Sequence, residues 1–420
     1  MGNIFVHVRM EAMSSLLKIS QQTLWQILGK VVTSLSTFVI LALIARNYSE
    51  EGTGIFTLVL TYLAMFYLLS DFGFNAHALK KYQISNIKYQ KEEFRKLLGT
   101  RILWSISLVI LAIATLLFWP FASREFTQAV IFGALAIIGS GIFVSCNLIF
   151  QSKLRYDLSV LASSAGTVVG LVSFIYLVNR HYPIPFLIAS HLLGWLVIAA
   201  AALFLVKRLL PMVSPIYDRL YTVDLFKSSW PIAATLTLNV IYFRADAFMI
   251  SYFRSNAEVG IYNVAYSLFQ TALVLPTFIM NSYYPMMLKS FKGIKYVGLG
   301  LLLLAGLGTL LTFFVAPFFT NILTGGGFSG SSQSLQILSL GFPAYFLSSL
   351  LMWVMVTRNQ YKKMLIIYGI GLLINLTLNF FYIPQYSFMA ASWITVISEY
   401  LILIMQAMVL LLFSERTQKT

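Results

Sequence analysis

Charged residues and cysteines are both scarce in this sequence. Asp, Glu, Lys and Arg together make up 10% of its 420 residues, whereas soluble domains carry about 25%. The single cysteine, Cys146, excludes a disulfide framework and a thiolate metal site, and the four histidines lack the spacing of metal ligands. No Gly-Lys-Ser/Thr sequence follows the glycines at 325–327, so a phosphate-binding loop and an ATP-driven pump are excluded.

Apolar residues account for 59% of the chain, more than a soluble core can bury. They form runs of about 18 or more residues, each long enough to cross a hydrocarbon core about 30 Å thick as a helix. The sequence therefore predicts an all-α polytopic membrane protein of about twelve transmembrane helices. The expected spans are 23–45, 54–76, 102–122, 127–150, 158–179, 185–206, 228–253, 261–283, 297–322, 332–356, 364–384 and 388–413.

The 29 Lys and Arg residues outnumber the 14 acidic residues, which gives a net charge of +15. With the N-terminus in the cytoplasm, 23 of the 29 fall in predicted cytoplasmic segments and four, Arg46, Arg124, Arg180 and Arg254, in external loops. This asymmetry follows the positive-inside rule and predicts that both termini are cytoplasmic. Anionic lipid of the inner leaflet accounts for the basic charge, so no nucleic-acid partner is expected. Residues 1–22 show no signal-peptide cleavage pattern, and we expect the first span to be retained.

A short pattern recurs about 206 residues apart. A polar acidic loop followed by Gly, Ile and an aromatic residue occurs in Arg46–Phe56 and again in Arg254–Tyr262. Because this offset corresponds to six spans, an even number, we expect two six-helix lobes of the same orientation, an arrangement that places a substrate cavity between the lobes. The predicted divisions are an N-terminal lobe at 1–206, a cytoplasmic connector at 207–227 and a C-terminal lobe at 228–420. Chance similarity between apolar segments is the alternative explanation.

The same segments resemble a known family. Glu50–Phe56 and Asp71–Phe74 look like the first helical hairpin of bacterial polysaccharide transporters, the Wzx-type flippases of O-antigen and other lipid-linked oligosaccharides. Tyr242–Asp246, Ile250–Tyr252 and Glu258–Tyr266 are similar to that family's seventh and eighth helices. The family belongs to a superfamily that also contains multidrug and toxin extrusion proteins and lipid II flippases. Lipid II flippases usually carry two further helices, so twelve spans favour the polysaccharide branch.

The resemblance implies a V-shaped cavity between the lobes and transport by alternating access. The implied cargo is an undecaprenyl-pyrophosphate-linked oligosaccharide, moved from the cytoplasmic to the outer leaflet of the bacterial inner membrane. Membrane lipids, and a glycan polymerase or glycosyltransferases, are the partners to expect for a monomeric transporter of this kind. No cofactor is expected; H⁺ or Na⁺ would be the coupling ion. An ion-coupled multidrug antiporter is the alternative, whereas the short predicted external loops leave no room for an enzyme's catalytic site.

Lys30 is the first candidate for a substrate-binding residue. It lies within span one on a polar stripe that also contains Gln26, at a spacing that suits a water-filled cavity. A charge inside the membrane costs about 3 kcal/mol or more, and an ammonium group can pair with phosphate in many geometries. The alternative is that Lys30 extends to the cytoplasmic interface, but that interface is about 15 Å away along the helix.

Arg244 and Asp246 are two further candidates for the substrate cavity. They lie two residues apart in span seven, so their side chains project to nearly opposite sides of the helix and cannot simply pair with each other. A guanidinium group suits bidentate contact with a pyrophosphate or a sugar carboxylate. The alternative is that both residues stabilise the lobe through partners on other helices.

Glu399 and Asp71 are the candidates for ion coupling. Glu399 lies midway along span twelve and is its only carboxylate, so it can bind a proton or Na⁺ as the driving ion. A hydrogen bond to a neighbouring helix is the alternative role. Asp71 lies near the cytoplasmic end of span two, where contact with lipid headgroups is the alternative.

Overall fold

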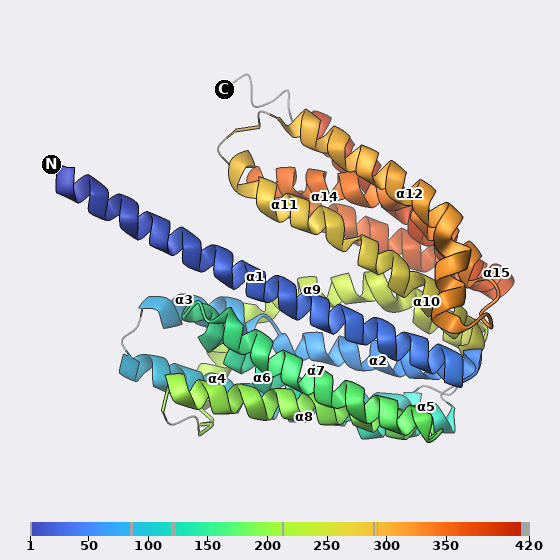
Figure 1. Ribbon diagram of the computed structural model, residues 1–420, viewed down its shortest axis with the longest axis horizontal. Helices are drawn as coiled ribbons and strands as arrows, with labels where there is room; N and C mark the ends of the chain where they lie inside the picture. Colours follow the sequence, from blue (N-terminus) through green and yellow to red (C-terminus); the bar gives the residue numbers. More distant parts are fainter. Residues whose placement is uncertain are drawn as a thin grey trace. The chain divides into compact units, whose positions relative to one another are not determined.

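The computed structural model consists of long α-helices (Figure 1). It describes the backbone of residues 2–84, 87–118, 123–211, 214–288, 290–291 and 293–412. Within these ranges it describes side chains from residue 22 onward, except 23, 80–84, 87–88, 235, 239–240, 281, 285 and 412. No strand occurs in the described ranges, which confirms the all-α prediction.

Each predicted span falls on one helix or on two consecutive helices, apart from the span ends at 119–122 and 413, which lie outside the described residues. The first half contains α1 (Gly2–Asn47), α2 (Glu50–Asp71), α3 (Phe74–Ile84), α4 (Ile87–Thr115), η1 (Leu116–Phe118), α5 (Arg124–Ala134), α6 (Ala136–Ser152), α7 (Tyr156–Asn179) and α8 (Ile184–Leu209). The second half contains α9 (Arg219–Phe253), α10 (Asn256–Ala272), α11 (Val274–Met287), α12 (Ile294–Thr324), α13 (Ser331–Ser339), α14 (Phe342–Thr357) and α15 (Tyr361–Leu412).

Nine helical stretches of the described chain are long and apolar enough to cross a membrane, or ten if the bent pair α13 and α14 forms one span. α15 counts once among these, although its 52 residues would extend about 78 Å as one straight helix, more than twice the hydrocarbon thickness. Ser387 breaks α15 with a φ of 54° and a ψ of −143°, at the turn expected between spans eleven and twelve. α9, which carries the predicted span seven, lies outside that count. The helices therefore accommodate about twelve spans.

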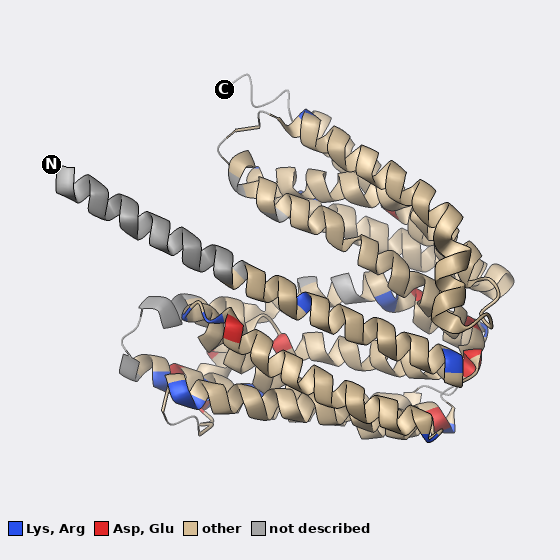
Figure 2. Ribbon diagram, in the orientation of Figure 1, with Lys and Arg blue, Asp and Glu red and all other residues tan. Residues whose placement is uncertain are grey.

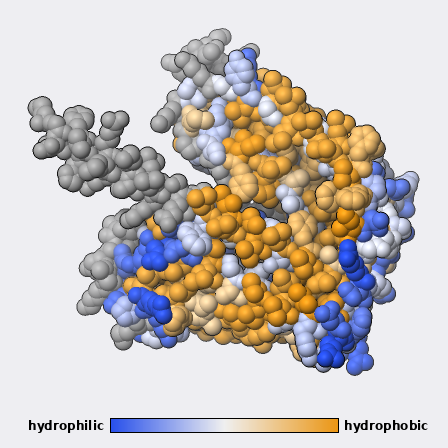
Figure 3. Space-filling model, viewed as in Figure 1, coloured by the Kyte–Doolittle hydropathy of each residue, from blue (hydrophilic) through white to orange (hydrophobic). Residues whose placement is uncertain are grey.

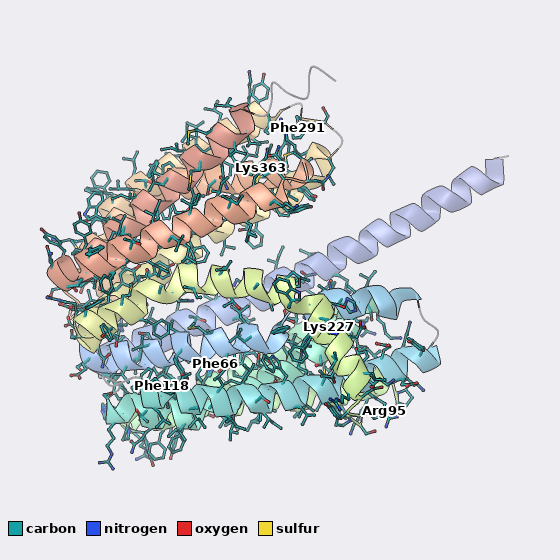
Figure 4. All side chains as sticks on the ribbon, turned by 180° about the vertical axis from the view of Figure 1, so that it is seen from behind. Phe66, Arg95, Phe118, Lys227, Phe291 and Lys363 are labelled. Atoms are coloured by element: carbon teal, nitrogen blue, oxygen red, sulfur yellow. The ribbon has the colours of Figure 1, made fainter. Side chains whose placement is uncertain are left out.

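Charged residues lie mostly toward the helix ends, with long uncharged stretches between them (Figure 2). Arg95 and Phe118 lie at opposite ends of the segment 87–118, and Phe291 and Lys363 lie at the same end of the C-terminal helices (Figure 4). The uncharged stretches carry the apolar side chains that a hydrocarbon environment requires.

The helices form two compact units. The first unit comprises the residues up to Leu43 together with Val59–Thr237, and α3, α4 and α6 enclose its buried core around Phe94 and Ile149. The second unit comprises Ile44–Leu58 and Leu238–Thr420. In its core the rings of Phe269 in α10 and Phe342 in α14 stack with their centroids 5.4 Å apart.

Helix boundaries recur along the chain. α1 ends at Asn47 and α2 begins at Glu50, while α9 ends at Phe253 and α10 begins at Asn256, at an offset of 206 residues. Later boundaries recur at a similar offset. The break between α5 and α6 corresponds to the break between α13 and α14, and the start of α7 at Tyr156 corresponds to the start of α15 at Tyr361. The predicted internal repeat is therefore confirmed in the order of the helices and their breaks.

Two glycines of the repeated motif contact each other's helices within the second unit. A Cβ atom at Gly54 would lie 1.6 Å from the carbonyl oxygen of Asn256, and one at Gly260 would lie 2.3 Å from the carbonyl oxygen of Glu50. Only glycine permits backbones to approach this closely. Because Glu50 corresponds to Asn256 and Gly54 to Gly260, the contact has local two-fold symmetry.

A polar contact continues this symmetry one turn further along the same two helices. The side-chain amide of Asn263 in α10 donates a hydrogen bond of 2.9 Å to the hydroxyl of Thr57 in α2, again between equivalent positions of the repeat. Both ends of the repeated segment are thereby fixed to each other by backbone contact and by a hydrogen bond.

The connector packs against α4 in the first unit. Gly99 leaves room for the backbone of Ile216, whose N–H donates a hydrogen bond of 3.0 Å to the carbonyl oxygen of Arg95. The Arg95 guanidinium in turn donates to the carbonyl oxygen of Ser214 at 2.9 Å and to its hydroxyl at 2.7 Å. The segment between the two halves is therefore held at one end of α4.

An ion pair adds to this attachment just before α9 begins. The ammonium group of Lys96 lies 3.0 Å from the carboxylate of Asp218, which also accepts a hydrogen bond from the backbone N–H of Tyr221 at 3.1 Å. The hydrogen bond from the Tyr221 N–H, and to a smaller extent the contact with Lys96, hold the pKa of the Asp218 carboxyl below its usual value.

Candidate functional site

Asp246 lies in the second half of α9 and is buried. Its carboxylate accepts a hydrogen bond from the hydroxyl of Tyr262 in α10 and another, of 2.8 Å, from the backbone N–H of Ala247. A buried carboxylate needs such donors because it has lost its hydration. The hydroxyl of Tyr262 links α10 to α9 beside the repeated motif, whereas the N–H of Ala247 belongs to α9 itself.

Glu399 lies in the C-terminal part of α15 and is also buried, with 4% of its surface exposed. The hydroxyl of Tyr242 in α9 donates a hydrogen bond of 2.6 Å to its carboxylate. The hydroxyl groups of Tyr345 and Ser348 in α14 lie next to the same carboxylate. Hydroxyl oxygens from two other helices, α9 and α14, therefore lie beside Glu399, and such an environment can hold a proton or a small cation.

Arg244 is half-buried on the same helix as Asp246. Among the described residues its guanidinium forms no ion pair and no hydrogen bond, including none with Asp246. Tyr266 in α10 lies within electrostatic reach of Arg244, Asp246 and Glu399. The second unit thus brings together three of the six predicted site residues, and the five N–H donors of Arg244 stay available to a ligand.

Lys30 and Gln26 lie on α1 in the first unit, and both side chains are exposed. In the part of the chain that the structure describes, neither side chain has a hydrogen-bond or ion-pair partner. Gln22 and Thr33 lie on the same polar face of α1 at three- and four-residue spacing from Gln26 and Lys30. Both are occupied, because Gln22 accepts a hydrogen bond of 3.3 Å from the backbone N–H of Asp157 and Thr33 bonds to its own helix. The polar stripe therefore offers Gln26 and Lys30, rather than its whole length, to a ligand.

Asp71 ends α2 in the first unit and lies 3.4 Å from the guanidinium of Arg101. Arg101 is fully buried in α4 and also donates to the carbonyl oxygen of Asp71 at 3.2 Å, to Asn75 at 2.9 Å and to Ser145 at 3.1 Å. From its place just before the third predicted span at 102–122, Arg101 is predicted to lie in the cytoplasmic loop between spans two and three. The loop position is wrong, because Arg101 is a buried residue of α4 whose hydrogen bonds fix the break between α2 and α3. Asp71, about one-third exposed, is the accessible member of this pair.

Residues 19–291 match the model of a family described as "Polysaccharide biosynthesis protein". The chain belongs to this family. The matched residues include Gln26, Lys30, Asp71, Arg244 and Asp246, whereas Glu399 lies beyond them.

Other known proteins also resemble this chain. A protein of Shigella dysenteriae, named as an O-antigen transporter, is 22% identical over 280 residues, which cover 64% of this chain and 68% of that protein. The solved structure of the lipid II flippase MurJ in an inward closed conformation has a TM-score of 0.76 at 14% identity and covers 92% of this chain and 87% of its own. The solved structure of an inward-facing multidrug resistance MATE family transporter of the MOP superfamily has a TM-score of 0.71 at 13% identity. The match covers 92% of this chain and 96% of that transporter. At these identities the two structures show that the chain shares their fold.

The sequence did not reveal the partners of the charged residues. Tyr242 shares a helix face with Asp246 in the sequence, yet its hydroxyl bonds to Glu399. Tyr262 occupies the position equivalent to Phe56 in the repeat, and its extra hydroxyl was the available signal for a partner of Asp246. No comparable signal marked Arg101, because it follows Arg95 and Lys96 in a basic segment.

Proposed function

We propose that this chain is a flippase that moves an undecaprenyl-pyrophosphate-linked oligosaccharide from the cytoplasmic to the outer leaflet of a bacterial inner membrane, for O-antigen, capsule or another surface polysaccharide. One observation carries the proposal beyond the family: Lys30 and Arg244, two basic side chains within predicted spans, have no ion pair among the described residues. An unpaired charge in a membrane is costly, so its presence favours a ligand of opposite charge. The pyrophosphate of a lipid-linked glycan supplies that charge.

The two bases suit a moving anionic headgroup in different ways. The rigid guanidinium of Arg244 can hold two phosphate oxygens at once, which favours orientation. The ammonium of Lys30 is a flexible point charge and can follow a phosphate as it moves. Gln26, one turn from Lys30, offers a neutral amide to the sugar hydroxyls, whereas the carboxylate of Asp246 is already engaged by Tyr262 and Ala247.

Coupling to an ion gradient is assigned to Glu399 and Asp71. Glu399 is enclosed by hydroxyl groups, which support reversible binding of H⁺ or Na⁺. The proposed transporter works in the cell membrane with the lipid-linked oligosaccharide as substrate and with a glycan polymerase or glycosyltransferases as partners.

The test is glycan export in a strain that lacks its own flippase, complemented with the parent chain or with the double variant Lys30→Ala/Arg244→Ala. We expect the double variant to reach the membrane at parent levels and to lose export. Lys30→Arg, which keeps the charge, should retain more export than Lys30→Ala. Arg124→Ala, which removes an exposed arginine of a predicted external loop, is the matched control and should export normally. Export at the parent level by the double variant would refute the assignment of these bases to the cargo.

A second candidate function is ion-coupled export of small molecules or drugs. The likeness to a MATE family fold and the two buried carboxylates Asp246 and Glu399 favour it, because organic cations bind to acidic sites. Efflux of a cationic dye from cells that produce the chain separates the two functions. Dye efflux that requires Asp246 and Glu399, with no glycan export, would select the antiporter.

A further inference from the structure

An apolar groove runs between α7 and α8 in the first unit. α7 and α8 touch at backbone distance where Gly166 approaches Gly194, so they are tightly joined in their middle parts. Beyond this point small side chains leave a hollow of about 570 Å³ between larger apolar ones. The lining includes Val172 and Tyr176 of α7 and Phe186, Ala189 and Leu193 of α8. In Figure 3 the surface over these helices is largely apolar, with hydrophilic residues toward the helix ends.

A guanidinium group lies at the mouth of this groove. Arg180 follows the last residue of α7, and its guanidinium carbon lies 5.9 Å from the ring centroid of Tyr176, which lines the groove. The groove extends from Arg180 to Val172, about 12 Å along the helix. Charge topology places Arg180 in an external loop, so the groove descends from the outer membrane interface into the hydrocarbon region.

Arg180 differs from two other arginines of the predicted external loops. Arg46 donates to the carbonyl oxygen of Ile322 at the end of α12, and Arg254 forms an ion pair of 3.1 Å with Glu258. The guanidinium of Arg180 has no acceptor among the described residues and contacts only an aromatic ring. A free cation directly above an apolar groove matches an amphiphile with an anionic head and a hydrocarbon chain.

We propose that this groove is a binding site for a glycerophospholipid of the outer leaflet. The phosphate accepts hydrogen bonds from Arg180, the glycerol region packs on the Tyr176 ring, and one acyl chain fills the space between α7 and α8. A second copy of the chain is the less favourable occupant, because it would cover the groove without supplying an acceptor for Arg180. The site is independent of the cargo in the proposed function, since all of its residues lie on the outward end of these two helices.

Native mass spectrometry of the full purified chain tests the site with added phosphatidylglycerol, and with phosphatidylcholine for comparison. We expect the parent chain to retain phosphatidylglycerol tightly. Arg180→Ala should retain this lipid about tenfold less well, or less still, because a charge-assisted hydrogen bond is lost. Arg124→Ala, a second exposed arginine of the predicted external loops, should retain the lipid as the parent does. Ala189→Phe, which fills the groove, should reduce retention of both lipids.

Thermal unfolding with and without phosphatidylglycerol gives an independent readout. The lipid should raise the unfolding midpoint of the parent chain and of Arg124→Ala, and should leave that of Arg180→Ala unchanged. If Ala189→Phe does not fold, the comparison of the two arginine variants decides by itself. An equal loss of phosphatidylglycerol binding in Arg180→Ala and Arg124→Ala, or a dimer of the chain in place of bound lipid, would overturn the proposal. Glycan export by Arg180→Ala is measured in parallel, so that loss of the lipid site is distinguished from loss of the transport function.

Discussion

Adding a single methyl group at Gly54 should destabilise the second unit. A Cβ atom there would lie 1.6 Å from the Asn256 carbonyl oxygen, whereas ordinary van der Waals contact begins at 3.4 Å. The obstacle is backbone, which cannot turn aside as a side chain can, so α2 and α10 must move apart. Overpacking of this kind costs about 1–3 kcal/mol, which exceeds the gain of about 1 kcal/mol that alanine brings over glycine within a helix.

The assay is thermal unfolding of the detergent-solubilised chain at one scan rate, with Gly306→Ala as the matched control. Gly306 lies within α12 of the same unit, and a Cβ atom there would meet no described atom within 4 Å, so this variant should be as stable as the parent or slightly more stable. Gly54→Ala and Gly260→Ala should each lower the midpoint. The double variant Gly54→Ala/Gly260→Ala should lower the midpoint by less than the sum of the two single decreases, because the first methyl group has already separated the helices. Full additivity, or a Gly54→Ala midpoint equal to that of Gly306→Ala, would refute the reasoning.

Two further predictions concern titratable groups. Contacts with Tyr221 and Lys96 lower the folded-state pKa of Asp218, so its stabilising contribution is present above the ordinary carboxyl pKa and is lost as the pH falls through the folded value. Asp218→Asn should therefore lower the unfolding midpoint at neutral pH, and the difference should shrink as the pH falls below the ordinary carboxyl pKa and through the folded-state pKa; a difference that is constant with pH would count against the ion pair. For the coupling role of Glu399, Glu399→Gln should abolish the dependence of transport on pH or on Na⁺, whereas Tyr242→Phe should shift that dependence without abolishing it. Transport by Glu399→Gln with the parent's response across a pH and Na⁺ series would exclude the coupling role.

The helices of this chain were predictable because hydrocarbon imposes a simple requirement on sequence. A span must be long, apolar and fully hydrogen-bonded within itself, so hydropathy marks where each helix lies. Loop positions follow from the same contrast, as the break of α15 at Ser387 shows. The repeat was visible because the motif around Gly54 and Gly260 combines polar residues with glycines that close backbone contact requires.

The partners of polar residues were not predictable in the same way. Arg101 stands in a basic segment that is typical of a loop, yet the break after Asp71 leaves a carbonyl oxygen and a carboxylate for it to bind inside the unit. Such pairing depends on which helices are neighbours, which a one-dimensional pattern does not encode. For the same reason the face of α9 that carries Asp246 was predicted, while the hydroxyl group of Tyr262 that binds it was not.

The contact between Gly54 and Gly260 also bears on the origin of the chain. Residues at equivalent positions of two copies touch each other only near a two-fold axis, as in the interface of a symmetric homodimer. The contacts of Gly54 with Asn256, of Gly260 with Glu50, and of Thr57 with Asn263 have this reciprocal form within one polypeptide. They are the contacts that two separate six-helix chains would make in a dimer, which points to an ancestor of half the length that was duplicated and fused. The equivalent positions Thr57 and Asn263 now carry different side chains, a hydroxyl and an amide, that hydrogen-bond to each other.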